Sequence, residues 1–140
     1  MPLSKSEREE FLSEPHIAAL SVFAGNDRGP LTVPIWYQYT PGGEAWVLTG
    51  KTSKKAELIR AAGRFSLMVE RTEPSIRYVS IDGPLLREEP GSEEKSREMA
   101  SRYLAPDKVE GYLEFEKTLG EHVAFYLEPR HWLSADMGAV

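Results

Sequence analysis

The residues of this sequence best suited to chemistry are three lysines gathered around one predicted helix start. Lys51, Lys54 and Lys55 follow a predicted strand and flank Ser53, the expected N-cap of the next helix. The first turn of a helix exposes unpaired backbone N–H groups and the positive end of the helix dipole, so it attracts anions. Lysines there cost about 0.3–1 kcal/mol each at low salt. Breaking a local rule in this way indicates function, here the binding of a phosphate group.

The same segment allows two other interpretations. A solvated basic turn would carry the same lysines without binding a ligand. Gly50-Lys51-Thr52 matches the end of a P-loop, but the glycine-rich turn that must precede it is missing. A nucleoside triphosphatase is therefore not expected.

Composition excludes several classes of function. The 140 residues suit a single domain over 1–140, and the net charge of -5 disfavours nucleic acid as a partner. The absence of cysteine excludes disulfides and thiolate metal sites, and His16, His122 and His131 lack metal-ligand spacing, so no metal is expected. The polar first residues do not resemble a signal peptide, and residues 17–25, the longest mostly apolar stretch, are too few to span a membrane. We expect a cytoplasmic protein without membrane contact.

Other side chains offer weaker signals. Trp36 and Trp132 could stack on a planar ligand, although core packing is the commoner role of tryptophan. Arg71 and Arg77 flank one predicted loop and could reach a ligand, but solvated arginines are the favoured interpretation. Pro34 cannot donate to a sheet ladder, so it marks an edge strand or a break in pairing.

Alternation of apolar residues and turn signals predict a mainly β fold. The first three strands should form an antiparallel meander, and a helix ending at Gly63 follows the third. The last helix should place Val109, Tyr112 and Leu113, together with Glu116, on one side. About six antiparallel strands with peripheral helices favour a partly closed barrel. The expected strands are 16–24, 31–40, 45–49, 64–71, 77–86 and 121–127; the expected helices are 4–12 with Ser6 as the candidate cap, 53–62, 92–104 and 108–119; residues 129–140 are expected to be an irregular tail.

At this point the sequence resembles a known family. The run Val33-Pro34-Ile35-Trp36-Tyr37, then Trp46-Val47-Leu48-Thr49, then Ser53-Lys54-Lys55-Ala56-Glu57-Leu58, and later Ile81-Asp82-Gly83-Pro84 carry the resemblance by their order and spacing. The family is that of the pyridoxamine-phosphate-oxidase-like split β-barrels, especially the branch that uses the deazaflavin coenzyme F-420 in place of FMN. The resemblance covers roughly residues 4–134.

The resemblance implies a cofactor site at the interface of a homodimer. The backbone around the second strand would lie beside the ring system, the end of the third strand would approach the ribityl phosphate, and Lys54 would be the chief phosphate ligand. Arg60, further along the helix, would join the lysines in binding the anionic tail of F-420. The implied cofactor-binding residues are Val33, Pro34, Ile35, Trp36, Leu48, Thr49, Gly50, Lys51, Ser53, Lys54 and Lys55.

The implied function is an oxidoreductase that transfers hydride from reduced F-420 to a small unsaturated or quinone-like organic acceptor. No catalytic residue is assigned, because the cofactor performs the difficult step; solvent or Tyr37 would supply a proton. The alternatives are an FMN-dependent oxidase or reductase and a non-catalytic flavin carrier. Residues 134–140 contain no basic segment of the kind that binds the substrate phosphate in pyridoxamine phosphate oxidases, so vitamin B6 oxidation is not expected.

Overall fold

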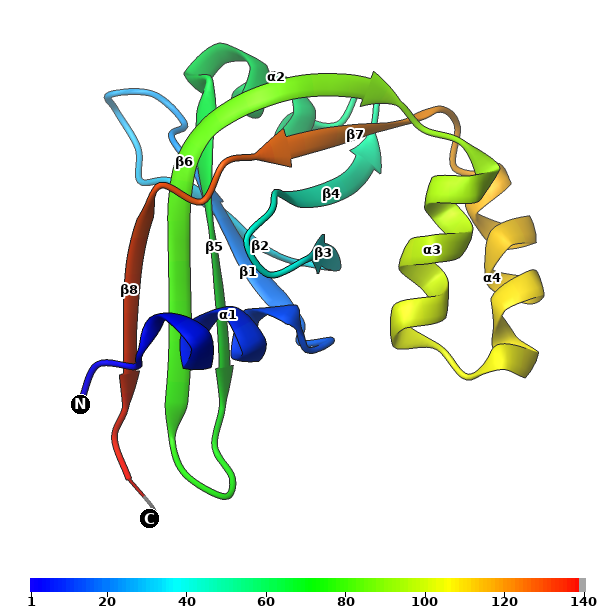
Figure 1. Ribbon diagram of the computed structural model, residues 1–140. Coiled ribbons are helices and arrows are strands. Elements are labelled where there is room, and N and C mark those ends of the chain that lie inside the picture. The colour runs from blue at the N-terminus through cyan, green and yellow to red at the C-terminus, as the bar shows by residue number, and fades with distance from the viewer. Residues whose placement is uncertain (139–140) are drawn as a thin grey trace.

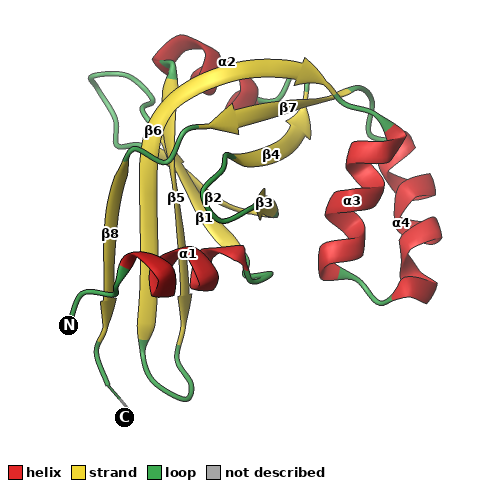
Figure 2. Ribbon diagram, in the orientation of Figure 1, coloured by secondary structure: helices red, strands yellow, loops and turns green. Residues whose placement is uncertain are grey.

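A strongly bent antiparallel sheet curls into a split barrel and carries helices on its outside (Figures 1 and 2). The computed structural model describes residues 1–138. Within this range the sheet has eight strands: β1 (Ala18–Val22), β2 (Leu31–Ile35), β3 (Tyr37–Tyr39), β4 (Ala45–Gly50), β5 (Arg64–Arg71), β6 (Arg77–Pro90), β7 (His122–Leu127) and β8 (His131–Asp136). The helices are α1 (Lys5–Ser13), α2 (Lys54–Ala62), α3 (Glu93–Tyr103) and α4 (Pro106–Lys117).

The long strand β6 joins the two halves of the barrel. The strand order is β2-β1-β5-β6-β7-β4-β3, and β8 also pairs with β6. The first part of β6 pairs with β5 and β8, and its second part pairs with β7 after a register shift between Leu85 and Arg87. Figure 1 shows β6 arching over the molecule between these partners. Gly83 lies near the bend, where an added Cβ would meet the carbonyl oxygen of Glu128 at 1.8 Å. The arch therefore requires glycine at this position.

The helix termini use the caps expected from their sequences, with one correction. Ser53 caps α2 by accepting from the backbone N–H of Ala56, and Gly63 ends that helix in the left-handed conformation with φ of 70°. The cap of α1 is Ser4 and not Ser6, because Ser4 forms a reciprocal capping box with Glu7. Within residues 1–138 no helix combines the length and apolar character needed to cross a membrane.

The main core fills the inside of the barrel and contains Tyr37 among its largest fully buried side chains. It draws on α1, α2 and most of the strands: Phe11, Leu12, Leu20, Tyr37, Val47, Ile59, Leu67, Val69, Val79, Ile81, Phe125 and Leu127 are each less than 3% exposed. Burial on this scale fixes the curvature of β1, β4 and β5 and holds the N-terminus of α2 beside the end of β4.

Helices α3 and α4 form a hairpin that stands away from the barrel (Figure 2). Two residues at the end of α3 tie it to the chain that leads into β1. The Tyr103 hydroxyl donates to the carbonyl oxygen of His16 at 2.7 Å, and Arg102 donates to the carbonyl oxygens of Ser13 and Glu14 at 2.7 and 2.8 Å. The hairpin therefore stands as a wall opposite β4.

The structure corrects the predicted second strand. Residues 31–40 form two strands, broken at Trp36, because β2 pairs with β1 whereas β3 pairs with β4. The first three predicted strands are thus no simple meander. Pro34 does lie on an edge strand, as expected, opposite Ala19.

Two further predictions are wrong, namely the end of the fifth strand at residue 86 and the irregular tail over residues 129–140. Strand β6 continues to Pro90, beyond the expected residue 86, because its polar second part pairs with β7 and its Arg87 binds Glu44 at 2.7 Å. Residues His131–Asp136 form β8, which adds to the free side of β6 through backbone hydrogen bonds. An edge strand of this kind needs little apolar alternation, so its sequence gives a weak signal.

Candidate cofactor pocket

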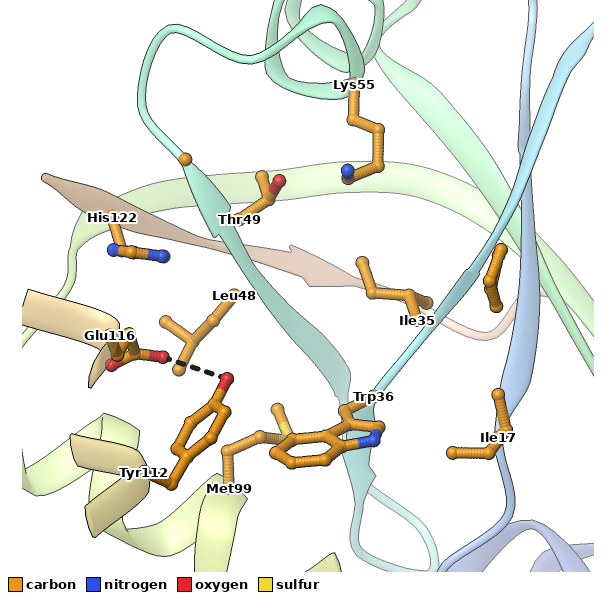
Figure 3. A pocket seen from close by; sticks show the side chains of 12 residues that line it. Ile17, Ile35, Trp36, Leu48, Thr49, Lys55, Met99, Tyr112, Glu116 and His122 are labelled. Atoms are coloured by element: carbon orange, nitrogen blue, oxygen red, sulfur yellow. Dashed lines mark hydrogen bonds between the residues drawn. The ribbon is translucent and has the colours of Figure 1, made fainter. Parts of the chain in front are cut away.

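A cavity of about 490 Å³ opens where the end of β4 faces the α3–α4 hairpin (Figure 3). This volume lies within the range of about 300–1,000 Å³ usual for small-molecule sites. Six separate elements contribute to it, because the split of the barrel leaves the β2–β3 break and the β4 end uncovered. The cavity is lined by Ile17, Pro34, Ile35, Trp36, Leu48, Thr49, Gly50, Lys55, Met99, Tyr112, Glu116 and His122.

One end of the cavity is formed by the last residues of β4 and the start of α2. Thr49 and Ser53 lie with their hydroxyl oxygens 3.2 Å apart, and the Ser53 hydroxyl also accepts from the N–H of Ala56 at 3.2 Å. The side chain of Lys55 is half-buried and points into the cavity (Figure 3). A cation and a helix N-terminus at one place form an anion site.

The structure separates the three lysines that the sequence grouped together. Lys51 pairs with Glu121 at 3.4 Å, and Lys54 pairs with Glu57 at 3.8 Å. Neither lines the cavity, whereas Lys55 does and has no carboxylate partner among residues 1–138. The geometry therefore favours Lys55 over Lys54 as the chief anion ligand.

Arg60 is not available to a ligand in the way the sequence suggested. Its guanidinium group makes two hydrogen bonds to the carboxylate of Glu88, at 2.8 and 2.9 Å. Such two-point pairs are geometrically fixed. This part of the expected cationic cluster is therefore engaged with β6.

The middle of the cavity is apolar. Ile35 and Leu48 face it from β2 and β4, and Trp36 closes it at the break between β2 and β3 (Figure 3). The ring of Trp36 stacks on Tyr103 with centroids 4.8 Å apart and lies 5.1 Å from the ring of Tyr112. These contacts hold the indole against the hairpin, so it offers the cavity a fixed apolar wall.

Val33 and Ser53 were expected at the site but do not line the cavity. Val33 packs on the main core, because it alternates with its outward-facing neighbours Thr32 and Pro34. Ser53 is occupied as the helix cap. Ile17 and Met99 line the cavity without having been predicted, and nothing in their local sequence marks them as site residues.

The other end of the cavity carries three polar residues that sequence reasoning missed as site residues. The Tyr112 hydroxyl donates to Oε2 of Glu116 at 3.5 Å, and Nδ1 of His122 lies 3.0 Å from the carbonyl oxygen of Gly120. Burial raises the pKa of Tyr112, and the neighbouring carboxylate of Glu116 raises it further. The only sequence signal was an acidic residue on the buried side of α4.

The prediction of Tyr37 as a proton donor is wrong. Tyr37 lies fully buried in the core, and its hydroxyl donates to the carbonyl oxygens of Leu12 and Glu14 at 2.5 and 2.9 Å. Burial raises the pKa of Tyr37 well above its ordinary value. Its role is structural, because it anchors the end of α1.

Trp132, Arg71 and Arg77 also lie outside the cavity lining. Trp132 packs under the guanidinium group of Arg8, 4.5 Å from the ring centroid. Arg71 and Arg77 both approach the carboxylate of Asp136 at the end of β8, at 3.8 and 2.9 Å. These arginines secure the C-terminal strand.

No protein-family model and no curated protein sequence matches the chain. Solved structures do. A conserved hypothetical protein, Rv2991 from Mycobacterium tuberculosis, superposes with a TM-score of 0.72 at 23% identity, over 96% of this chain and 85% of that one. A protein described as an F420 reductase superposes with a TM-score of 0.67 at 17% identity, over 89% of this chain and 94% of that one. A putative pyridoxamine 5′-phosphate oxidase from Listeria innocua superposes with a TM-score of 0.62 at 12% identity, over 93% of this chain and 96% of that one. At these identities the similarity shows the fold, and it confirms the predicted split β-barrel.

Proposed function

We propose that this protein is an oxidoreductase that binds a flavin-type cofactor, F-420 in preference to FMN, and reduces a small unsaturated or quinone-like organic acceptor. The observation that carries the proposal is the junction of β4 and α2. There a helix N-terminus and the inward-pointing Lys55 adjoin an apolar slot between Leu48 and Trp36.

The residues present fit such a cofactor. A phosphate needs donors and positive charge, which the first turn of α2 and Lys55 provide. Gly50 has no side chain to narrow the space in front of the first turn of α2. This space is not tightly packed, since an added Cβ would lie 3.7 Å from Ser53. A planar ring system needs flat apolar walls, which Ile35, Trp36 and Leu48 provide.

The protein's contribution is position, electrostatics and exclusion of water. When bound, the reduced deazaflavin supplies a hydride from C5, and a proton from solvent completes the two-electron reduction of the acceptor. Lys55 would hold the anionic end, and Trp36 would fix the plane of the ring. The α3–α4 hairpin, through Met99 and Tyr112, would cover the acceptor from the opposite side.

The preference for F-420 rests on the sequence resemblance, on the structural neighbour described as an F420 reductase, and on charge. F-420 extends beyond its phosphate into an anionic tail. Lys51 and Lys54 are 56% and 63% exposed, and exposed ion pairs of this kind are worth about 0–1 kcal/mol. Both lysines can therefore leave their glutamates for the tail at little cost.

We propose further that the protein works as a homodimer. A shallow groove of about 310 Å³ on the outer face of β1 and β2 shares Ile17 and Pro34 with the cofactor pocket, and Ala19 and Met68 extend its apolar surface. Ile17 and Phe23 are each more than half exposed. A second copy on this face would cover these side chains and close the rim of the pocket. Light scattering should give twice the 15.8 kDa mass of one chain, and a monomer mass at micromolar concentration would contradict the dimer.

Two alternatives share this pocket. The sequence resemblance to pyridoxamine-phosphate-oxidase-like proteins, a description that one structural neighbour also carries, supports FMN as the alternative cofactor. A non-catalytic carrier would hold either cofactor in the same contacts. Binding and turnover measured together separate the three functions.

The direct test mixes the purified protein with reduced F-420 or reduced FMN and with menadione as a quinone probe, without oxygen. We expect the protein to accelerate the oxidation of F-420, and the Lys55→Ala variant to need more cofactor for the same rate. Tight binding of F-420 without acceleration would favour the carrier. If the protein accelerates only the oxidation of reduced FMN, FMN is the cofactor. If the protein binds neither F-420 nor FMN, the proposal is refuted.

A further inference from the structure

The cofactor pocket is electrically polarised. Lys55 lies at one end, and the carboxylate of Glu116 lies at the other, with the apolar walls between them (Figure 3). Glu116 is only 9% exposed, which is unusual for a glutamate on an otherwise acidic, solvated helix. A carboxylate at this position would not help the pocket to bind a phosphate group.

Glu116 is poorly satisfied by the protein itself. Among residues 1–138 its carboxylate takes part in no ion pair, although its neighbour Lys117 binds Glu114 on the same helix at 3.3 Å. Its one side-chain hydrogen bond comes from the Tyr112 hydroxyl at the long distance of 3.5 Å. A carboxylate has about four acceptor positions, so most of those of Glu116 are free to receive donors from a ligand.

His122 adds a second acceptor at the same end. Its Nδ1 lies 3.0 Å from the carbonyl oxygen of Gly120, an acceptor that requires Nδ1 to carry the hydrogen. In the neutral ring Nε2 is then left as an acceptor. Among the lining side chains of residues 1–138, the two donors at this end are already engaged, Nδ1–H of His122 with Gly120 and the Tyr112 hydroxyl with Glu116. This end of the pocket is therefore rich in acceptors and poor in free donors.

Glu116 and His122 also form the partition between two cavities. Both line the cofactor pocket and a smaller cavity of about 160 Å³ beside the start of α3. The carboxylate can thus receive a ligand group from the pocket while its surroundings remain polar on the far side. Tyr112, packed on Trp36, fixes the direction in which that carboxylate faces.

We infer that the acceptor substrate carries a cationic nitrogen group, an ammonium or amidinium, which binds Glu116 at the end of the pocket opposite Lys55. This inference rests on the proposed function and names its substrate class. A cofactor phosphate held by Lys55 leaves the Glu116 end to the acceptor. A charge-assisted hydrogen bond to a partly buried carboxylate is strong enough to select such a group over a neutral one, and it disfavours an anionic one.

The test uses three planar molecules of nearly equal shape: benzamidine, benzamide and benzoate. Each is titrated into the protein and followed by changes in its NMR spectrum. We expect benzamidine to bind about tenfold more tightly than benzamide, and benzoate to bind most weakly. In Glu116→Gln, which keeps the shape of the side chain, the advantage of benzamidine should fall to about twofold or less.

Glu114→Gln is the matched control, because it makes the same change on the same helix at an exposed position. It should keep the full preference for benzamidine. A preference that survives in Glu116→Gln, or that disappears equally in Glu114→Gln, would overturn the inference. In the unmodified protein, nuclear Overhauser contacts should join benzamidine to the ring of Tyr112, and their absence would overturn it independently of how the variants fold.

Cofactor titration on the same samples keeps the two hypotheses apart. Failure to bind F-420 or FMN, with the benzamidine preference intact, would refute the proposed function and leave the cation site standing. Cofactor binding without any benzamidine preference would refute the cation site alone.

Discussion

The two adjacent lysines at the start of α2 allow a paired test of the anion site. Lys55 lines the pocket, whereas Lys54 lies outside the lining, 63% exposed and paired with Glu57. Lys55→Ala and Lys54→Ala remove the same charge from the same helical turn. We expect only the first to weaken cofactor binding strongly.

The magnitude follows from the position of Lys55. A hydrogen bond to a charged group contributes about 1.5–3 kcal/mol, and each 1.4 kcal/mol changes affinity about tenfold. Lys55→Ala should therefore raise the dissociation constant by about tenfold to a hundredfold. Lys54→Ala removes an exposed charge that acts through solvent, and it should raise the constant by about threefold or less.

Neither substitution should affect folding much. Alanine is the best helix former, and Lys55 makes no ion pair within residues 1–138 whose loss would destabilise the helix. Calorimetric titration of FMN and F-420, with urea unfolding of each variant as the control, measures both effects. A larger loss of affinity in Lys54→Ala than in Lys55→Ala would refute the geometric reasoning.

Three further predictions concern the scaffold. Tyr37→Phe should lower the free energy of unfolding by about 1–3 kcal/mol, since it leaves the buried carbonyl oxygen of Leu12 without its donor, yet turnover should be unchanged; a turnover defect in a stable variant would restore Tyr37 as a proton donor. Gly83→Ala should prevent stable folding, because its Cβ would lie 1.8 Å from a backbone oxygen. In Gly111→Ala, on α4, the added Cβ meets nothing within 4 Å, so this variant should raise the free energy of unfolding by about 0.5–1 kcal/mol. Equal behaviour of the two variants in urea unfolding would contradict this prediction. The backbone N–H of Gly138, followed by neighbouring side chains, lowers the pKa of Asp136 from 3.8 to about 2, so its contribution to stability is present above pH 4 and is lost as the pH falls toward 2. The melting temperature of Asp136→Asn should therefore depend less on pH in this window than that of the unmodified protein, and parallel curves would show that Asp136 contributes nothing.

The helix start that carries the candidate anion site could be predicted because its signal is local. Ser53 as a helix cap, Gly63 as the helix end and lysines in place of acids are all readable within a dozen residues, and the structure has the two caps as expected. The choice between Lys54 and Lys55 is not local. Adjacent residues on a helix point about 100° apart, so the orientation of α2 against β4 decides which one enters the pocket.

The opposite end of the pocket depends on tertiary packing. Tyr112 and Glu116 lie more than 60 residues from β4 in the sequence and reach it because Tyr103 and Arg102 fasten the hairpin, whereas His122 reaches it as the sheet partner of Gly50. Neither of these tethers has a sequence pattern that distinguishes it from an ordinary helical residue. Similarly, β8 was missed because an edge strand is defined by its backbone partner on β6.

The central claim is that the junction of β4 and α2 binds a flavin-type cofactor and prefers F-420. Titrating F-420 and FMN into the same protein at low and at high salt tests it most directly. We predict that F-420 binds more tightly at low salt, and that salt weakens F-420 more steeply, because Lys51 and Lys54 can turn toward its anionic tail. If FMN binds as tightly as F-420 at low salt the preference is contradicted, and if neither cofactor binds the claim itself is contradicted.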